Sequence, residues 1–206
     1  MVSGETLAQA IRELIDQVAG RDAPESALAD AATAVKEAAE RLRAAGTARH
    51  AVTVRRASGD LWRYRRFSPV SGVLNPLAPP VQYDEIREGT VSASVTFGVA
   101  YQGPPGYVHG AFIAGAFDDV LGAANVASGN PGMTVKLEVR YLRPTPLNTR
   151  LRIDAWHVSR EGRRIHAKAS MHAGDAITAE ADGVFAEITV NRARELFPGV
   201  ANDAAV

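Results

Sequence analysis

The chain has 206 residues, no cysteine, and equal numbers of basic and acidic residues, 23 of each. A neutral chain has no overall field that would attract nucleic acid or a membrane surface. The absence of cysteine excludes disulfides, thiolate metal ligands and a cysteine nucleophile. The N-terminus lacks the basic and apolar regions of a secretory signal. We therefore expect a cytoplasmic protein without nucleic-acid or membrane partners.

Two helices are expected at the N-terminal end. Apolar residues recur at helical spacing over 3–19, and an alanine-rich pattern follows from Pro24 to Gly46. Proline suits a first helical turn and glycine a helix end. Joined by a short loop, the helices form a hairpin over 1–46. It contains no cluster of catalytic residue types, so packing or oligomer support is its expected role.

The segment 47–88 is expected to connect this hairpin to the main domain. Loosely alternating apolar residues within 47–67 indicate a small β-hairpin. Its six arginines either line a solvated strand face or form a patch for phosphates, whose oxygens arginine forks match. The six are Arg49, Arg55, Arg56, Arg63, Arg65 and Arg66. Four prolines between 69 and 80 then predict an ordered loop, and such a loop can cover a pocket.

Strand patterns begin at Thr90 and continue to about residue 190. One alternating stretch precedes a long apolar segment at 110–127, and four follow it, with turn signals at Gly162 and Gly174. The order is one strand, one long helix and four strands in hairpin succession. We therefore expect an α+β domain over 89–190, in which an antiparallel sheet wraps the helix, and an irregular tail over 191–206.

Two adjacent carboxylates, Asp118 and Asp119, stand in the middle of that apolar helix. Such a helix is buried, and buried carboxylates are costly unless they are paired, hydrated or used in chemistry. Neighbouring helical residues point about 100° apart, so the two cannot face one pocket. Asp118 shares a side with Gly115 and Gly122, whose small size leaves room for a ligand. Asp119 is expected to pair with another group, and an arginine is the candidate.

The helix begins just after His109, and its first N–H groups belong to Gly110 and Ala111. Free N–H groups at a helix start can stabilise an oxyanion in acyl transfer. Asp118 can activate water as a general base or attack an acyl carbon. Structural roles are equally open: His109 can cap the turn, and Asp118 can bind a backbone N–H of the proline-rich loop.

Spacing limits how these groups can act together. Eight residues place Asp118 about 12 Å along the helix axis from Gly110, whereas an oxyanion donor acts at about 3 Å. One helix therefore cannot supply both groups to one carbonyl. Two helices packed antiparallel across a two-fold axis can, so a site of this kind requires a dimer with two shared sites. The histidines show no metal-binding spacing on a helix, and no metal site is predicted.

The stretch GPPGYVHGAFIAGAFDD, followed by GMTVKLEVRYLRPTPL, resembles the PaaI-type acyl-CoA thioesterases of the hotdog fold. The likeness covers roughly residues 90–190. It rests on the spacing of histidine, glycine and aspartate, combined with the later T-x-x-L-x-V-x-Y-x-x-P pattern. It implies a long helix wrapped by an antiparallel sheet and paired into a dimer or tetramer. It also implies hydrolysis of acyl-CoA thioesters, with coenzyme A as part of the substrate and no separate cofactor.

The resemblance also implies roles for individual residues. Asp118 matches the family's acidic residue that activates water or attacks the thioester. Gly110 matches the glycine whose N–H polarises the thioester carbonyl across the dimer interface, and His109 the histidine beside it. Thr134 matches the residue that positions the water or the carboxylate. Expected contacts with coenzyme A come from Ala111, Arg143, Arg160, Gly162, Arg163 and Arg164; Ala111 stands where the family usually has a second glycine.

Two other functions fit the same residues. A non-catalytic acyl-CoA sensor on this fold would bind acyl-CoA without releasing the thiol. A hydratase or dehydratase would need a histidine and an acid facing one pocket, and His109 with Asp118 is the only candidate pair.

Overall fold

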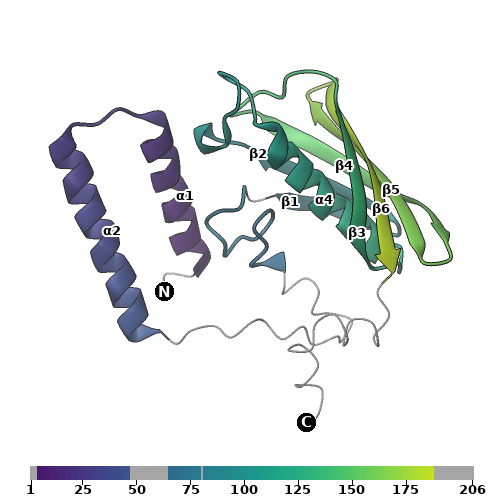
Figure 1. The fold of residues 1–206 in the computed structure, drawn as a ribbon, viewed down its shortest axis with the longest axis horizontal. Coiled ribbons are helices and arrows are strands. Elements are labelled where there is room, and N and C mark those ends of the chain that lie inside the picture. Colours follow the sequence, from purple (N-terminus) through teal and green to yellow (C-terminus); the bar gives the residue numbers. More distant parts are fainter. Residues whose placement is uncertain (1–3, 47–64, 80, 188–206) are drawn as a thin grey trace, which may run out of the picture.

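The computed structural model describes residues 4–46, 65–79 and 81–187. Helices α1 (Gly4–Gly20) and α2 (Glu25–Ala45) come first. The main domain contains β1 (Gln82–Arg87), β2 (Thr90–Thr96), a short 3₁₀ helix η1 (Val99–Tyr101), α4 (Gly110–Ala127), β3 (Gly132–Tyr141), β4 (Arg150–Glu161), β5 (Arg164–Ala173) and β6 (Ala176–Glu187). Figure 1 shows α4 against one face of the sheet, with α1 between the sheet and α2. Within the described ranges, no helix is both long and apolar enough to cross a membrane.

The six strands form one antiparallel sheet in the order β1-β2-β4-β5-β6-β3. The expected succession of four strands joined by hairpins is wrong at one point, because β3 pairs with β6 whereas β4 pairs with β2 and β5. The prolines at 144 and 146 lie in the connection after β3, where they provide no N–H for a tight hairpin. The connection after β3 therefore runs from the edge of the sheet to β4, which lies between β2 and β5. Strand β1 lies in the stretch for which we expected a connecting loop.

Helix α4 supplies the centre of the hydrophobic core. The expected helix over 110–127 is confirmed, and its buried residues are Ile113, Ala116, Phe117, Val120, Leu121, Ala123, Ala124 and Asn125. The helix and the sheet approach closely at Gly183 of β6, where an added Cβ would lie 2.7 Å from the Phe185 ring and 3.1 Å from Leu121. Even a methyl group at this glycine would therefore force the helix or the ring to move.

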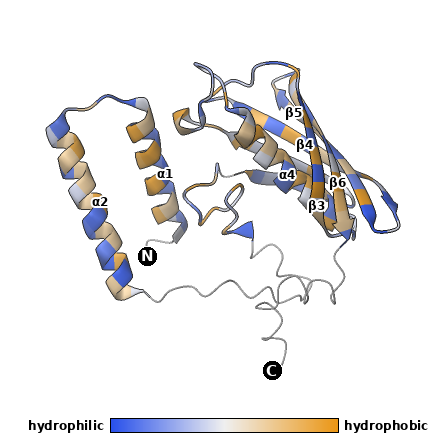
Figure 2. Ribbon diagram, viewed as in Figure 1, coloured by the Kyte–Doolittle hydropathy of each residue, from blue (hydrophilic) through white to orange (hydrophobic). Residues whose placement is uncertain are grey.

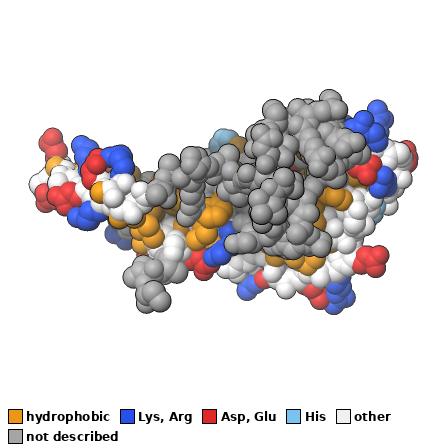
Figure 3. Space-filling model, turned by 90° about the horizontal axis from the view of Figure 1, so that it is seen from below, with side chains coloured by type: hydrophobic (Ala, Val, Ile, Leu, Met, Phe, Trp, Pro, Cys, Tyr) orange, Lys and Arg blue, Asp and Glu red, His pale blue; other side chains and the backbone are white. Residues whose placement is uncertain are grey.

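The N-terminal hairpin lies at one end of the main domain. The two helices expected over 3–19 and 24–46 are confirmed to within a residue or two. Three hydrogen bonds join helix α1 to later parts of the described chain: Asp16 accepts from the Ala100 N–H at 3.1 Å, Arg12 donates to the Asn75 carbonyl at 3.1 Å, and Glu5 accepts from Arg66. Helix α2 buries none of its residues. Seen from below in Figure 3, the helices project from the rest of the molecule.

Parts of the expected connection cannot be compared with the structure. Most of the small hairpin expected within 47–67 lies outside the described residues, as do four of its six arginines and the tail over 191–206. The described part, 65–79, forms a series of turns that packs along α4. This agrees with the ordered loop that its prolines predict.

Candidate active site

The first turn of α4 is capped by His109. Its backbone is extended, and its Nδ1 accepts a hydrogen bond from the Ala111 N–H at 3.1 Å. A neutral imidazole that accepts at Nδ1 carries its proton on Nε2. The capping role that we considered for His109 is therefore the observed arrangement. The Ala111 N–H, which we expected to be free, is already bound to this ring.

Gly110 is held by the end of β3. The Tyr141 hydroxyl donates to the Gly110 carbonyl at 2.9 Å, and a Cβ added to Gly110 would lie 3.1 Å from the Tyr141 ring. None of the described residues accepts a hydrogen bond from the Gly110 N–H. The sequence placed Tyr141 only in an alternating strand and in the T-x-x-L-x-V-x-Y-x-x-P pattern. It did not predict the contact of Tyr141 with the first turn of α4.

Asp118 contacts a residue of β3 on the exposed side of α4. The Thr134 hydroxyl donates to Asp118 Oδ1 at 2.6 Å, and both residues are exposed. A β-bulge makes this contact possible, because the register with β6 shifts between Thr134 and Lys136 and leaves Val135 as an extra residue. The extra residue turns Thr134 toward α4 and Val135 outward, where it is 63% exposed. The bulge therefore interrupts the simple alternation of apolar and polar residues along β3.

Asp119 is bound on another side of the helix. Its Oδ2 accepts from Arg65 at 3.1 Å and from the Tyr83 hydroxyl, and its Oδ1 accepts from Ser68 at 3.5 Å. The side chains of Arg65 and Asp119 are only 17% and 15% exposed. The expected pairing of Asp119 with an arginine is confirmed. Burial raises the pKa of Tyr83 well above its usual value, so this hydroxyl stays protonated and donates.

The segment 65–79 covers the glycine-containing side of α4. An added Cβ on Gly115 would lie 3.6 Å from Val70, and one on Gly122 would lie 3.8 Å from Arg65. We expected this side to leave room for a ligand beside Asp118. Protein atoms occupy it instead, since the same segment binds Asp119. A Cβ added to either of these glycines would lie within 4 Å of no sheet strand.

The residues expected to contact coenzyme A lie in two places. Gly162 forms the β4–β5 turn with a positive φ of 59°. Beside it, Arg160 donates to Glu187 at 2.7 Å and to Asn130 at 3.2 Å, and Arg163 donates to the Glu187 carbonyl at 3.5 Å. Arg164 is exposed and has no partner among the described residues. Arg143 lies beyond the far end of β3 and donates to the Ile177 carbonyl at 2.7 Å.

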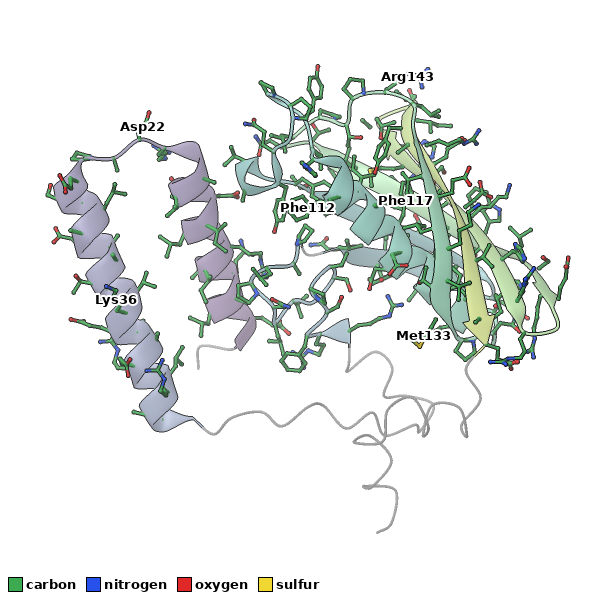
Figure 4. All side chains as sticks on the ribbon, viewed as in Figure 1. Asp22, Lys36, Phe112, Phe117, Met133 and Arg143 are labelled. Carbon is green, nitrogen blue, oxygen red and sulfur yellow. The ribbon has the colours of Figure 1, made fainter. Side chains whose placement is uncertain are left out.

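Within one chain the candidate residues thus form two groups. His109 and Gly110 lie near Tyr141 and Arg143, whereas Asp118 and Thr134 lie near the opposite end of β3. Figure 4 labels Arg143 and Met133 at these two ends. Strand registers place Arg164 in the same row as Met133, two strands away and therefore about 10 Å distant. In the part of the chain that the structure describes, no group of His, Asp and Glu side chains could hold a metal ion.

Comparison with known proteins identifies the family. The model of the thioesterase superfamily matches residues 105–180, which include α4, β3, β4 and β5. The crystal structure of protein RHA08564, a thioesterase superfamily protein, has a TM-score of 0.80 and 32% sequence identity, covering 90% of this chain and 91% of that one. This chain belongs to the thioesterase superfamily. The antiparallel sheet around α4 is accordingly a hotdog fold, and α1 and α2 are an N-terminal helical extension to it.

Other similar proteins match a smaller part of the chain. Mouse acyl-coenzyme A thioesterase THEM4 is 30% identical over 108 residues, which are 52% of this chain and 46% of the mouse protein. The chain spans less than half the length of the curated relatives that it matches. Protein smu.793 from Streptococcus mutans, whose structure was solved bound to acetyl CoA, is 17% identical with a TM-score of 0.50, covering 52% of this chain and 88% of that one. At this identity the likeness concerns the fold alone.

Proposed function

We propose that this protein hydrolyses acyl-CoA thioesters to a free acid and CoA, at sites that two chains share. Its membership of the thioesterase superfamily and its likeness to THEM4 support this chemistry. The observation that carries the proposal is the state of Asp118. This exposed carboxylate sits in a mostly apolar helix, one oxygen accepts from Thr134 at 2.6 Å, and no described residue donates a hydrogen bond to the other.

Thr134 and Asp118 divide the work in this mechanism. The hydroxyl donates to Oδ1 and fixes the carboxylate, which leaves Oδ2 to accept a proton from water as it attacks the thioester carbonyl. A direct attack by Oδ2, forming an anhydride, is the other route. In the water route the C–S bond then breaks, CoA leaves as a thiolate, and the proton held by Asp118 converts it to the thiol. The products are the free acid and CoA.

The oxyanion donor in this mechanism comes from a second chain. The Gly110 N–H has no described acceptor, but it lies about 12 Å along the helix from Asp118 of the same chain. The partner subunit's Gly110 can meet Asp118 if the two α4 helices run antiparallel. Its N–H then stabilises the negative charge that develops on the carbonyl oxygen.

The free edge of β3 supports such a pairing. This ten-residue strand ends the sheet, and it exposes Met133, Val135 and Tyr141. The opposite edge, β1, has only six residues, a bulge and mostly charged or polar side chains, features that discourage pairing. Antiparallel pairing of two β3 edges would bring the Gly110 end of one chain beside the Asp118 end of the other. A homodimer is therefore part of the proposal.

Thiol release from a panel of acyl-CoA substrates tests the reaction. Asp118→Asn should reduce the rate by about a thousandfold, because the amide cannot take a proton from water. The matched control is Asp175→Asn, which changes an exposed aspartate in the β5–β6 turn and should leave the rate unaltered. An unchanged rate in Asp118→Asn would refute the proposed chemistry.

A complementation experiment tests the sharing of sites. Gly110→Pro removes the donor N–H but suits the first helical position, and His109 already has the extended backbone that precedes proline. Gly110→Ala is the control, since it adds a Cβ near Tyr141 and keeps the N–H. Chains carrying Asp118→Asn, co-expressed with chains carrying Gly110→Pro, should recover about a quarter of the wild-type rate, because half of the dimers are mixed and each of these has one intact site. If no activity is recovered, the Gly110 N–H and the Asp118 carboxylate act within one chain.

The other two functions predict different results. A sensor would bind acyl-CoA and release no thiol. A hydratase would form 3-hydroxyacyl-CoA from enoyl-CoA, using His109 and Asp118 together. Within one chain that pairing lacks support, since His109 caps the helix and lies nine residues, or about 13 Å along the axis, before Asp118.

A further inference from the structure

Helix α2 exposes an apolar stripe that no described residue covers. Every residue of this 21-residue helix is exposed, and its largest apolar side chains, Leu28, Val35 and Leu42, are 50%, 48% and 55% exposed. In proteins most of the stability of a helix comes from packing of its apolar face. Helix α1 leaves its own apolar residues Leu7 and Val18 exposed as well. Figure 2 shows these hydrophobic segments on both helices.

The stripe has the spacing of a helix-pairing seam. Leu28, Val35 and Leu42 follow one another at intervals of seven, which is the heptad repeat of paired helices. Three residues after each comes an alanine, at 31, 38 and 45. Alanines also flank the seam, at 27, 32, 34 and 39. Small residues on both sides of a seam allow another helix to approach closely.

Charged residues of α2 lie mostly away from this seam. Asp30, Lys36, Glu37, Glu40 and Arg43 all fall on the opposite side of the heptad. The ion pairs within the helix, Arg41 with Glu37 and Arg43 with Glu40, involve that side too. The helix is therefore amphipathic, although its apolar side faces no described part of its own chain.

We propose that α2 packs antiparallel against α2 of a second copy of this chain, through the seam of Leu28, Val35 and Leu42. In the antiparallel alignment each large residue meets a small one: Val35 lies opposite the partner subunit's Ala38, and Leu28 opposite the partner subunit's Ala45. A parallel alignment would instead place alanine against alanine in alternate layers and leave gaps. The chain's own α2 thus provides the complementary surface.

Charge favours the same partner and orientation. The first ten residues of α2 carry Glu25 and Asp30 and no basic residue, whereas the last ten carry Lys36, Arg41 and Arg43 against Glu37 and Glu40, a net charge of +1. Antiparallel pairing therefore sets the acidic part of one helix beside the net basic part of the other, with Asp30 and Arg43 outside the seam itself, and it also opposes the two helix dipoles. The contact is symmetric, as expected of a pair of identical subunits. It does not depend on the proposed thioesterase reaction.

Engineered cysteines test the pairing in the full chain, which has no natural cysteine. Chains carrying Leu28→Cys, co-expressed with chains carrying Ala45→Cys, should form a mixed disulfide under mild oxidation. Leu28→Cys alone should not, because antiparallel copies hold these positions about 25 Å apart, and a disulfide requires Cα atoms within about 7 Å. The matched control combines Thr33→Cys with Glu40→Cys, which lie at one level in the same alignment but on the opposite side of the helix. A disulfide between two Leu28→Cys chains, or none in the first mixture, would overturn the proposal.

A seam substitution provides the second test. Val35→Glu should raise the dissociation constant of the α2 contact by about tenfold or more, because pairing would bury two carboxylates in an apolar seam. Thr33→Glu, on the opposite side, should leave it unchanged. Neither change can unfold the main domain, since α2 buries no residue there. Sedimentation equilibrium over a range of concentrations measures the effect, and the same assembly in Val35→Glu as in the wild type would contradict the proposal.

Discussion

The two neighbouring carboxylates of α4 lie in opposite surroundings. Asp119 is largely buried, and Arg65, Tyr83 and Ser68 all donate to it from a segment far away in the sequence. Asp118 is exposed, and the Thr134 hydroxyl alone among the described residues donates to its side chain. A carboxylate whose two oxygens both accept hydrogen bonds from the protein stabilises the fold. One with an oxygen that accepts no such bond can take a proton from water. One position along a helix therefore separates a structural carboxylate from the proposed catalytic carboxylate.

The largest expected change on the Asp119 side is in stability. Arg65→Met should reduce the free energy of unfolding by about 3 kcal/mol, because it leaves the Asp119 carboxylate buried without its counter-charge. Arg66→Met is the control. Arg66 pairs with Glu5, both are about half exposed, and the change should cost less than about 1 kcal/mol. Urea unfolding of both variants measures the difference, and equal losses would show that the buried pair of Arg65 and Asp119 stabilises the fold no more than the exposed pair of Arg66 and Glu5.

On the Asp118 side the expected change is in rate. Thr134→Ala should slow thiol release by about tenfold, equivalent to about 1.4 kcal/mol of transition-state stabilisation, since Asp118 loses the bond that orients it. Thr134→Ser keeps the hydroxyl and should retain most of the rate. Both variants should unfold within about 0.5 kcal/mol of the wild type, because the site is exposed. A large loss of stability with an unaltered rate would mean that Thr134 stabilises the fold and does not assist the reaction.

The smallest expected effect depends on pH. Tyr83→Phe should cost about 1 kcal/mol at neutral pH through the lost bond to Asp119. Burial raises the folded-state pKa of Tyr83 above its ordinary value of 10.0. The contribution of this hydroxyl is therefore complete below about pH 10 and is lost as the pH rises further, since the unfolded chain releases the proton first. Unfolding at pH 7 and pH 11 should show the gap between the two proteins shrinking, and a constant gap would contradict this.

Local patterns predicted the helix and the pairing of Asp119, but contacts between distant segments were harder to foresee. The bounds of α4 follow from the apolar run after His109, and an acid buried in such a run needs a partner. The identity of that partner did not follow, because Arg65 precedes it by 54 residues. The bulge at Val135 arises from the register between β3 and β6, so alternation within one strand could not reveal it. For the same reason the order of strands in the sheet was predicted incorrectly.

The free edge of β3 has a further consequence for newly made chains. A folded chain without a partner exposes the outer edge of the ten-residue strand β3, together with the apolar side chains beside it. Such an edge can add any compatible strand, including one from a misfolded neighbour. The shared site proposed here would thus tie activity to protection against aggregation, since the contact that completes the site also covers the edge.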